Sequence, residues 1–251
     1  MPIPKKLTNL GRLSTILLTL SLLAACSHTR KMQDTPDRFE RLNRSVYKVN
    51  DVLDRRIVKP VAIAYKKITP EIIDNSITNV FANLDDVGNA INNLLQFKLG
   101  ESLIDTERFI FNSTFGVAGI FDIATEMGLQ KHEEDFGQTL AKWGVPSGPY
   151  VMLPLLGPSS IRDATAKLSV DVITKPTSYS ENSWGLFVVD KLDQRADLLS
   201  AEAVLQGFSE DQYSVLRGVW LQRREYLIQD GKVDKKAQTD MIDELEELEA
   251  E

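Results

Sequence analysis

The chain has very little of the residue types on which disulfide frameworks, metal centres and most hydrolytic active sites depend. Its 251 residues include one cysteine, Cys26, and two histidines, His28 and His132. A single thiol excludes an internal disulfide and a metal site with several thiolates. Two histidines leave little material for histidine-based acid–base catalysis. The chain also lacks a G-x-S-x-G elbow, a P-loop, an H-E-x-x-H motif and a G-x-G-x-x-G motif.

Positive charge is in the minority. Lys+Arg 29 against Asp+Glu 36 gives a net charge of -7. Residues 1–25 carry Lys5, Lys6 and Arg12 and no acid, so residues 26–251 have a net charge of -10, which is -7 less these three. Bulk charge does not draw such a body to nucleic-acid phosphates, and we expect no nucleic-acid partner. With 26% charged and 43% apolar residues, neither a disordered polymer nor a polytopic membrane protein fits.

The first 25 residues are typical of a secretory leader. Three basic residues precede the apolar run Leu13–Leu23, which is shorter than the roughly 20 residues needed to cross a bilayer. Leu23-Ala-Ala-Cys26 then follows, the pattern of lipoprotein processing; the alternative is an ordinary leader with a chance cysteine. We predict a lipoprotein signal peptide over 1–25, lipidation of Cys26 by palmitate-like chains, and a polar tether over 26–36. Ser27 follows the cysteine, as in lipoproteins exported to the outer membrane.

Apolar residues spaced by three and four predict a mainly α fold. A stripe at 39, 42, 46, 49 and 53 predicts a helix with its apolar face inward, interrupted at Pro60. The pattern predicts further helices over 73–84 and 87–95, one capped at Ser102, and one opening at Ser209-x-x-Gln212 and ending at Gly231. The sequence shows no sustained alternation of apolar and polar residues, and no Asn-Gly or Asp-Gly turn lies between apolar runs. It therefore predicts no hairpin. Residues 232–251 are acidic, and we expect a flexible tail there.

One apolar stretch lies in a segment rich in glycine and proline. It is too short to cross a bilayer, and Pro154 interrupts it. Two interpretations stay open: a buried loop of the core, or an element that dips into lipid. If the second interpretation holds, the side chains that contact the membrane are Tyr150, Val151, Met152, Leu153, Leu155 and Leu156.

Candidate catalytic and metal-binding groups are few. His132-Glu-Glu-Asp135 gathers four possible ligands, but consecutive side chains point in different directions, which favours a polar loop over a metal site. Asp105 and Glu107 beside Arg108 are interpreted as pairs on a helix surface. We therefore expect no catalytic residues, no metal and no cofactor.

The first predicted helix carries a basic face in an acidic body. Arg41, Arg44 and Lys48 lie on it, and arginine offers a bidentate partner for a head-group phosphate. Asn43 and Asn50 would hold the helix against its neighbours. These five residues are predicted to form a gate with head-group contacts; the alternative is a solvated basic face.

Several blocks stand in a characteristic order between Asp37 and about Leu227. They include Asp37-Arg-Phe-Glu-Arg-Leu-Asn-Arg44, Asn79-x-Phe-x-Asn-Leu84, Asn112-Ser-Thr-x-Gly116, Glu134-Asp-Phe-Gly-Gln-Thr-Leu140, Trp143-Gly-Val145 and Gly148-Pro-Tyr-Val151. In these blocks the chain resembles the MlaA (VacJ) family of outer-membrane lipoproteins. It departs from the family's pattern at Arg38, where proline is usual, at Val49, often aromatic, and at Phe97, Ala141 and Ala166, where glycine is common.

The resemblance implies a ring-like, membrane-embedded single domain over 37–231, built from amphipathic helices around a central channel. Its implied function is to remove mislocalised phospholipids from the outer leaflet and so maintain outer-membrane lipid asymmetry. The implied partners are phospholipids, outer-membrane porin trimers and the periplasmic lipid carrier MlaC, in a Gram-negative cell envelope. The resemblance implies no enzyme activity. An envelope phospholipid hydrolase and a porin-associated structural lipoprotein remain as alternatives.

Overall fold

The structure is a computed structural model that describes residues 36–199 and 211–232. The predicted leader over 1–25, Cys26, nearly all of the tether and nearly all of the acidic tail lie outside these residues. The described elements are α2 (Glu40–Leu53), the π-helix η2 (Asp54–Val58), α3 (Lys59–Ile68), α4 (Glu71–Leu95), α5 (Leu99–Thr114), α6 (Ile123–Glu126), α7 (Phe136–Lys142), β1 (Tyr150–Leu153), β2 (Gly157–Ser160), α8 (Ile161–Ala166), the π-helix η3 (Lys167–Asp171), α9 (Val172–Thr174), the 3₁₀-helix η4 (Pro176–Tyr179), α10 (Ser183–Asp197) and α12 (Gln212–Ile228).

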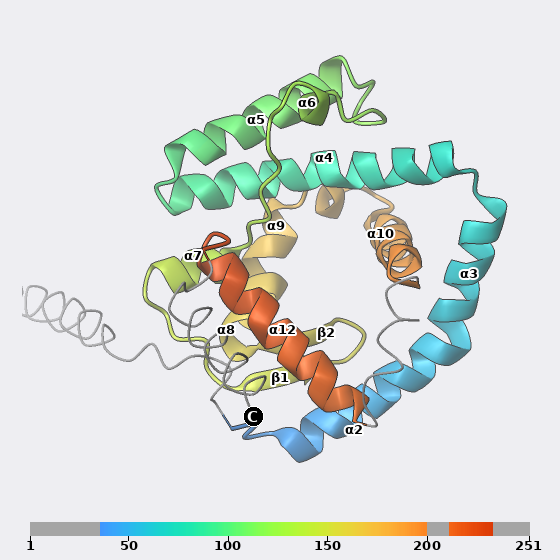
Figure 1. The fold of residues 1–251 in the computed structure, drawn as a ribbon, viewed down its shortest axis with the longest axis vertical. Coiled ribbons are helices and arrows are strands. Elements are labelled where there is room, and N and C mark those ends of the chain that lie inside the picture. The colour runs from blue at the N-terminus through green and yellow to red at the C-terminus, as the bar shows by residue number, and fades with distance from the viewer. Residues whose placement is uncertain (1–35, 200–210, 233–251) are drawn as a thin grey trace, which may run out of the picture.

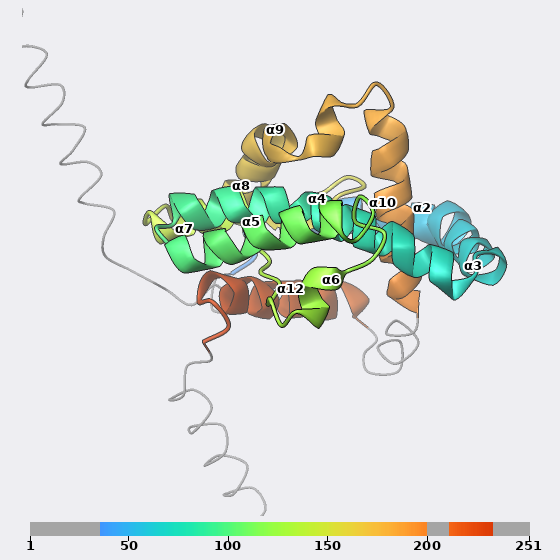
Figure 2. The ribbon, with the colours of Figure 1, turned by 90° about the horizontal axis from the view of Figure 1, so that it is seen from above.

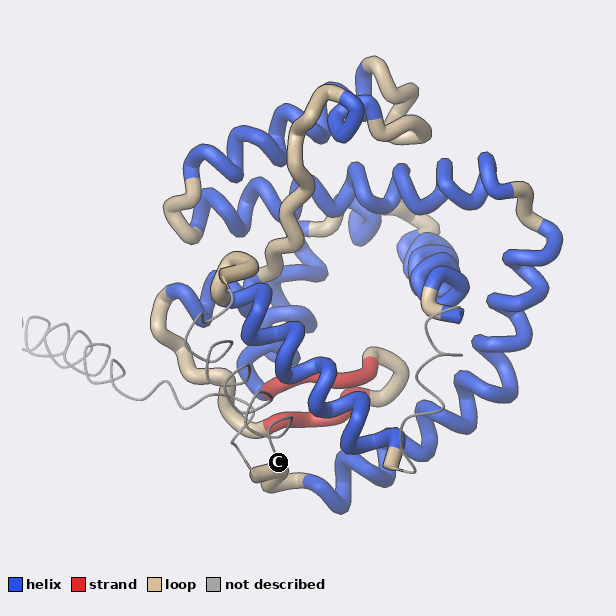
Figure 3. Tube along the Cα trace, viewed as in Figure 1, coloured by secondary structure: helices blue, strands red, loops and turns tan. Residues whose placement is uncertain are grey.

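The helices are arranged around a centre (Figure 1). The segment from α2 to α3 curves along one side, α4 and α5 close the top, and α7, α8 and α9 form the opposite side. Seen from above, most of these elements lie in one flat layer, with α9 and the start of α10 standing out on one face and α12 on the other (Figure 2). The prediction of a mainly helical fold is confirmed, and Figure 3 shows how little of the ring is strand.

Two helices are longer than the sequence pattern predicted. From Glu40 to Ile68 the chain is helical without a break, so the predicted interruption at Pro60 is wrong. Pro60 lies in the first turn of α3, directly after the π-helical stretch, where a missing backbone N–H is tolerated. Likewise α4 is one helix of 25 residues, not two. The predicted cap at Ser102 is also wrong, because α5 begins at Leu99.

The predicted absence of a hairpin is wrong as well. β1 and β2 pair antiparallel, with Tyr150 opposite Ser160 and Leu153 opposite Gly157. The turn contains Leu155 at φ 63° and is followed by Gly157 at φ 79°. A turn with leucine rather than asparagine or glycine at a positive φ lacks the usual sequence signal.

Polar side chains fill the interior and apolar side chains cover much of the outside. The buried residues of α4 are all polar, namely Asp74, Asn83, Asp86, Asn89, Asn92 and Asn93. The Asn93 amide donates to Asp105 Oδ2 of α5 at 2.7 Å, and Asn83 donates to Ser113 Oγ at 3.0 Å. Meanwhile Phe97 is 84% exposed. Such a distribution is the reverse of a water-soluble core and marks an interaction surface.

The α2 helix also has a polar residue buried and apolar residues exposed. Leu42 and Val49 are exposed and Asn43 is the buried residue of α2. The predicted inward packing of the stripe at 39, 42, 46, 49 and 53 is therefore wrong for its exposed members, because polar contacts occupy the inner face. No helix among the described residues is both long and apolar enough to cross a membrane.

A small apolar core joins α2, the hairpin and α12. Tyr150, Met152, Tyr213 and Leu221 form it, and the Tyr150 and Tyr213 rings meet edge to face at 6.4 Å between centroids. Asn43 fixes α2 to the hairpin backbone. Its Nδ2 donates to the Tyr150 carbonyl at 3.2 Å, and its Oδ1 accepts from the Met152 N–H at 2.9 Å.

We predict that Asn43→Ala lowers the free energy of unfolding by about 1–3 kcal/mol, because it leaves a buried strand N–H and a buried carbonyl without partners. Denaturant unfolding in detergent measures the change. Ser45→Ala, at an exposed position of the same helix, is the control and should change stability by less than about 0.5 kcal/mol. Equal losses for the two variants would contradict the prediction.

Candidate functional site

Two adjoining cavities are lined by residues of several elements of the ring. The polar cavity, of about 490 Å³, is lined by charged and amide side chains that include Asn89, Lys131, Glu134, Arg223 and Arg224. The apolar cavity, of about 440 Å³, has an apolar wall formed by Phe81, Leu84, Leu156, Leu168, Val172, Pro176, Trp184, Leu186 and Phe187. The polar cavity reaches α12 and the apolar cavity reaches η4 and the start of α10, which stand on opposite faces of the layer in Figure 2.

Six charged residues line both cavities and therefore mark where the two adjoin. We call this set the collar: Asp85, Lys167, Asp171, Lys175, Asp190 and Lys191. Lys175 Nζ lies 2.9 Å from Asp85 Oδ1, and Lys191 Nζ lies 3.2 Å from Asp190 Oδ2. Asp171 Oδ1 accepts from the Phe136 N–H at 2.9 Å. A molecule passing from one cavity to the other therefore meets ammonium and carboxylate groups between an apolar and a polar wall.

A buried arginine fixes the floor of the polar cavity. Arg224 donates to both carboxylate oxygens of Asp135, at 2.6 and 2.8 Å, and to Asp163 Oδ1 at 2.9 Å. Burial alone would lower the pKa of Arg224 and raise that of Asp135. Their mutual hydrogen bonds outweigh it, so the Arg224 pKa is raised and the Asp135 pKa lowered. A Cβ at Gly137 would lie 2.5 Å from Arg224 Nη2, so only glycine fits beside the pair.

The segment 132–135 is a polar connector. His132 Nδ1 lies 2.7 Å from Asp105 Oδ1 of α5, and Glu133 pairs with Arg223 of α12 at 2.7 Å. Glu134 pairs with Lys98 at 2.8 Å, and Asp135 holds Arg224. The four side chains thus have four different partners. In the part of the chain that the structure describes, no group of three or more His, Cys, Asp or Glu could hold a metal.

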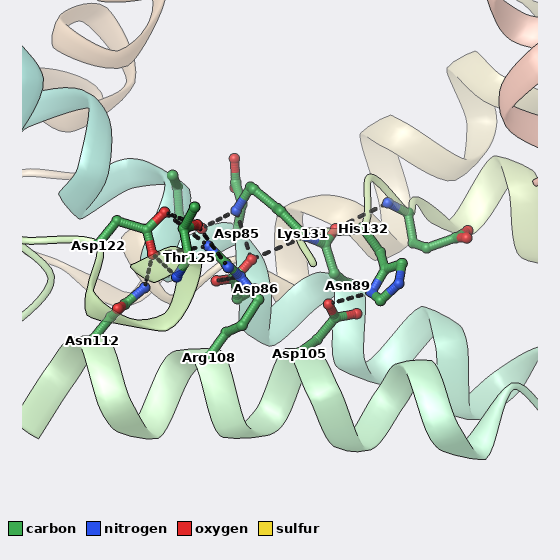
Figure 4. Close-up of polar contacts among 12 residues, drawn as sticks. Asp85, Asp86, Asn89, Asp105, Arg108, Asn112, Asp122, Thr125, Lys131 and His132 are labelled. Carbon is green, nitrogen blue, oxygen red and sulfur yellow. Dashed lines mark hydrogen bonds and ion pairs between the residues drawn. The ribbon is translucent and has the colours of Figure 1, made fainter. Parts of the chain in front are cut away.

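An ion cluster joins α4, α5 and α6 (Figure 4), and one of its members, Lys131, lines the polar cavity. The Arg108 guanidinium, 1% exposed, donates to both Asp122 oxygens at 3.1 Å and to Asp86 Oδ2 at 3.3 Å. Lys131 donates to Asp86 Oδ1 at 2.6 Å. The interpretation of Asp105 and Arg108 as surface pairs is wrong, because this face of α5 packs on the polar face of α4.

The five residues predicted as a gate do not line either cavity. Arg41 and Lys48 are exposed, while Arg44 pairs with Asp211 at 2.7 Å and lies 4.4 Å from the centre of the Tyr213 ring. Asn50, like Asn43, binds the hairpin: it donates to the Leu153 carbonyl and accepts from the Leu155 N–H, both at 2.9 Å.

The predicted membrane-contacting residues divide between the faces of the hairpin. Tyr150 and Met152 are each 5% exposed, so their predicted lipid contact is corrected: alternate residues of a strand face the core. Val151 and Leu153 are half-buried. Leu156 lines the apolar cavity, and Leu155, at 75%, is the exposed member of the set.

The collar was not predicted from the sequence. Lys167, Asp171 and Lys175 follow one another at intervals of four residues, the spacing that places side chains on one helical face. That spacing was the available signal. Asp85 and Asp190 come from α4 and α10, and no local pattern connects them to it.

Comparisons with known proteins agree on one family. The MlaA lipoprotein family model matches residues 35–227. The chain is 31% identical over 233 residues to the intermembrane phospholipid transport system lipoprotein MlaA of Escherichia coli, covering 88% of this chain and 90% of that one. It is 33% identical over 196 residues to an uncharacterized protein of Rickettsia felis, covering 77% and 78%.

A solved structure is similar in fold as well. It is described as "Structural basis for maintenance of bacterial outer membrane lipid asymmetry" and matches with a TM-score of 0.70 and 32% identity. The match covers 77% of this chain and 100% of that chain.

The ion cluster predicts a loss of stability in acid. Burial alone would raise the pKa of Asp122, but hydrogen bonds from Thr125, Asn112 and Arg108 outweigh it and hold the pKa at about 2, below its ordinary 3.8. The stabilisation is therefore fully present above pH 3.8 and is lost as the pH falls to about 2.

We predict that Asp122→Asn lowers the free energy of unfolding by about 1–2 kcal/mol at pH 7, after discounting for solvent screening, and that this difference shrinks as the pH falls toward 2. Urea unfolding of both proteins across this pH range measures it. Glu126→Gln, exposed in the same short helix, is the control. A difference that does not change with pH would count against the prediction.

Proposed function

The chain belongs to the MlaA lipoprotein family, and from that premise we propose that it is the phospholipid-transport lipoprotein of a Gram-negative cell envelope. It removes mislocalised phospholipids from the outer leaflet and so maintains outer-membrane lipid asymmetry. The observation that carries this proposal is the pair of adjoining cavities. A phospholipid has two apolar tails and one charged head, and the ring offers an apolar cavity, a charged collar and a polar cavity in that order.

The outer face supports a position within the lipid layer. Exposed apolar side chains cover the outside of α4 and α5, among them Ile72, Leu94, Phe97, Leu103 and Ile110. Amphipathic helices and acyl chains together hold a protein at a bilayer without a spanning helix. We place the protein in the outer membrane, anchored by acyl chains on Cys26, with Leu155 contributing to lipid contact.

The α2 helix is proposed to act on the cavity through the hairpin. Asn43 and Asn50 hold the strand backbone, and Leu156 of the same hairpin turn lines the apolar cavity. A shift of α2 would therefore move one wall of the passage. Arg41 and Lys48, both exposed, remain candidates for head-group contacts at the protein surface.

The proposed partners follow from the resemblance. Outer-membrane porin trimers would hold the ring in place, and the periplasmic carrier MlaC would receive the lipid. The surroundings of the serine and histidine side chains favour transport over hydrolysis. Ser159 lines the polar cavity, but its hydroxyl donates to the Ser160 carbonyl at 3.3 Å, and His132 lies on Asp105.

We predict that Val172→Trp slows phospholipid transfer several-fold, because the larger ring fills part of the apolar cavity that Val172 lines. The assay is extraction of a fluorescent phospholipid from proteoliposomes by the purified carrier. Val188→Trp, at an exposed position of α10 outside both cavities, is the matched control and should transfer as the wild type does.

The same assay separates the alternatives. Mass analysis of the recovered lipid should show intact phospholipid. Release of fatty acid and lysophospholipid would favour the hydrolase. No transfer by the wild-type protein, together with retained porin binding, would favour the structural lipoprotein.

We predict that Leu103→Cys in membranes reacts with a charged, water-soluble maleimide at least about tenfold more slowly than Gln130→Cys, because hydrocarbon excludes water and charged reagents. Both positions are exposed in the protein, so a difference in rate reports the bilayer. Both variants should react alike after denaturation. Equal rates in intact membranes would show that this face of α5 lies in water.

A further inference from the structure

The three lysines of the collar differ in their surroundings. Lys175 is paired with Asp85, and Lys191 lies on Asp190 and donates to Gln194 Oε1 at 2.8 Å. The side-chain ammonium of Lys167 has no hydrogen bond or ion pair with any of the described residues. The Lys167 side chain is exposed to solvent, and it lines both cavities.

The electrostatic surroundings of Lys167 disfavour its charge. Although solvent reaches the side chain, the protein packed around it partly desolvates the Lys167 ammonium and lowers its pKa, and the neighbouring ammonium groups of Lys191 and Lys175 lower it further. The carboxylates of Asp135 and Asp171 only partly offset this. An anion at this position would supply the missing counter-charge.

We propose that Lys167 binds the phosphate of a zwitterionic glycerophospholipid as the lipid passes between the two cavities. The inference rests on the proposed function and adds the group that recognises the lipid. Leu168 and Val172, which follow Lys167 in the chain, line the apolar cavity. With its phosphate on Lys167, a lipid can therefore place its acyl chains against the apolar wall. Inorganic phosphate has no acyl chains and would leave the apolar wall uncovered.

The charge balance of the collar selects the head group. The collar contains three lysines and three aspartates, so its formal charges sum to zero. A lipid with a net negative charge would leave it unbalanced, whereas an ethanolamine head group brings its own ammonium. Asp171, four residues after Lys167, offers that ammonium a carboxylate whose Oδ1 is already held by the Phe136 N–H. Phosphatidylethanolamine thus fits better than phosphatidylglycerol.

The test uses the full-length lipidated protein in detergent and three short-chain probes. Dihexanoyl phosphatidylethanolamine carries the zwitterionic head, dihexanoyl phosphatidylglycerol is anionic, and dihexanoylglycerol has no phosphate. Titration calorimetry gives the dissociation constants. Lys167→Met should weaken phosphatidylethanolamine binding about tenfold and leave dihexanoylglycerol binding unchanged, because one charge-assisted contact is lost. Lys167→Arg should largely restore it.

The control is Lys67→Met, which removes an exposed lysine of α3 that lines neither cavity. Unchanged affinity of Lys167→Met for phosphatidylethanolamine would overturn the proposal, as would an equal loss for dihexanoylglycerol, which would assign Lys167 to packing. Equal wild-type affinities for the two phospholipids would overturn the zwitterionic selection. If the wild type binds none of the probes, the proposed function itself fails, and this inference with it.

Discussion

The ion pair between Arg108 and Asp86 is the contact on which the geometry of the ring depends. Both side chains are almost fully buried, and each has further partners: Asp122 for the arginine and Lys131 for the aspartate. Removing one member of a buried pair leaves an uncompensated charge, at a cost of about 3–5 kcal/mol. Because the pair joins α4 to α5 and, through Lys131, to the residue that precedes the connector segment, it fixes these three parts of the chain relative to one another.

An interior held by polar contacts explains how the ring can remain hollow. A hydrophobic core gains free energy from every void that it closes. Hydrogen bonds and ion pairs are instead satisfied one at a time, at defined distances, and do not require the space beside them to be filled. The connector residues from His132 to Asp135 bind separate elements in this way. The buried residues of the small apolar core, among them Tyr150 and Tyr213, line neither cavity.

Sequence reasoning found the helical class, because apolar spacing of three and four depends only on local geometry. The prediction of which helix face points toward the interior was wrong. The stripe of α2 was assigned to the interior on the rule that apolar residues are buried, which holds for proteins whose surroundings are water. The hairpin was missed because its turn uses Leu155 in a left-handed conformation. Asn43 and Asn50 were correctly expected to position a helix, but their partners are backbone groups more than 100 residues away, and no local pattern specifies such contacts.

The apolar exterior also limits how the protein can travel to its membrane. On the proposed route the chain is exported and crosses an aqueous compartment, where side chains such as Ile68, Ile72 and Phe97 would face water. Continuous apolar surface in water promotes self-association. A chain with this exterior therefore needs either an escort that covers the apolar surface or a very low concentration until it reaches the membrane.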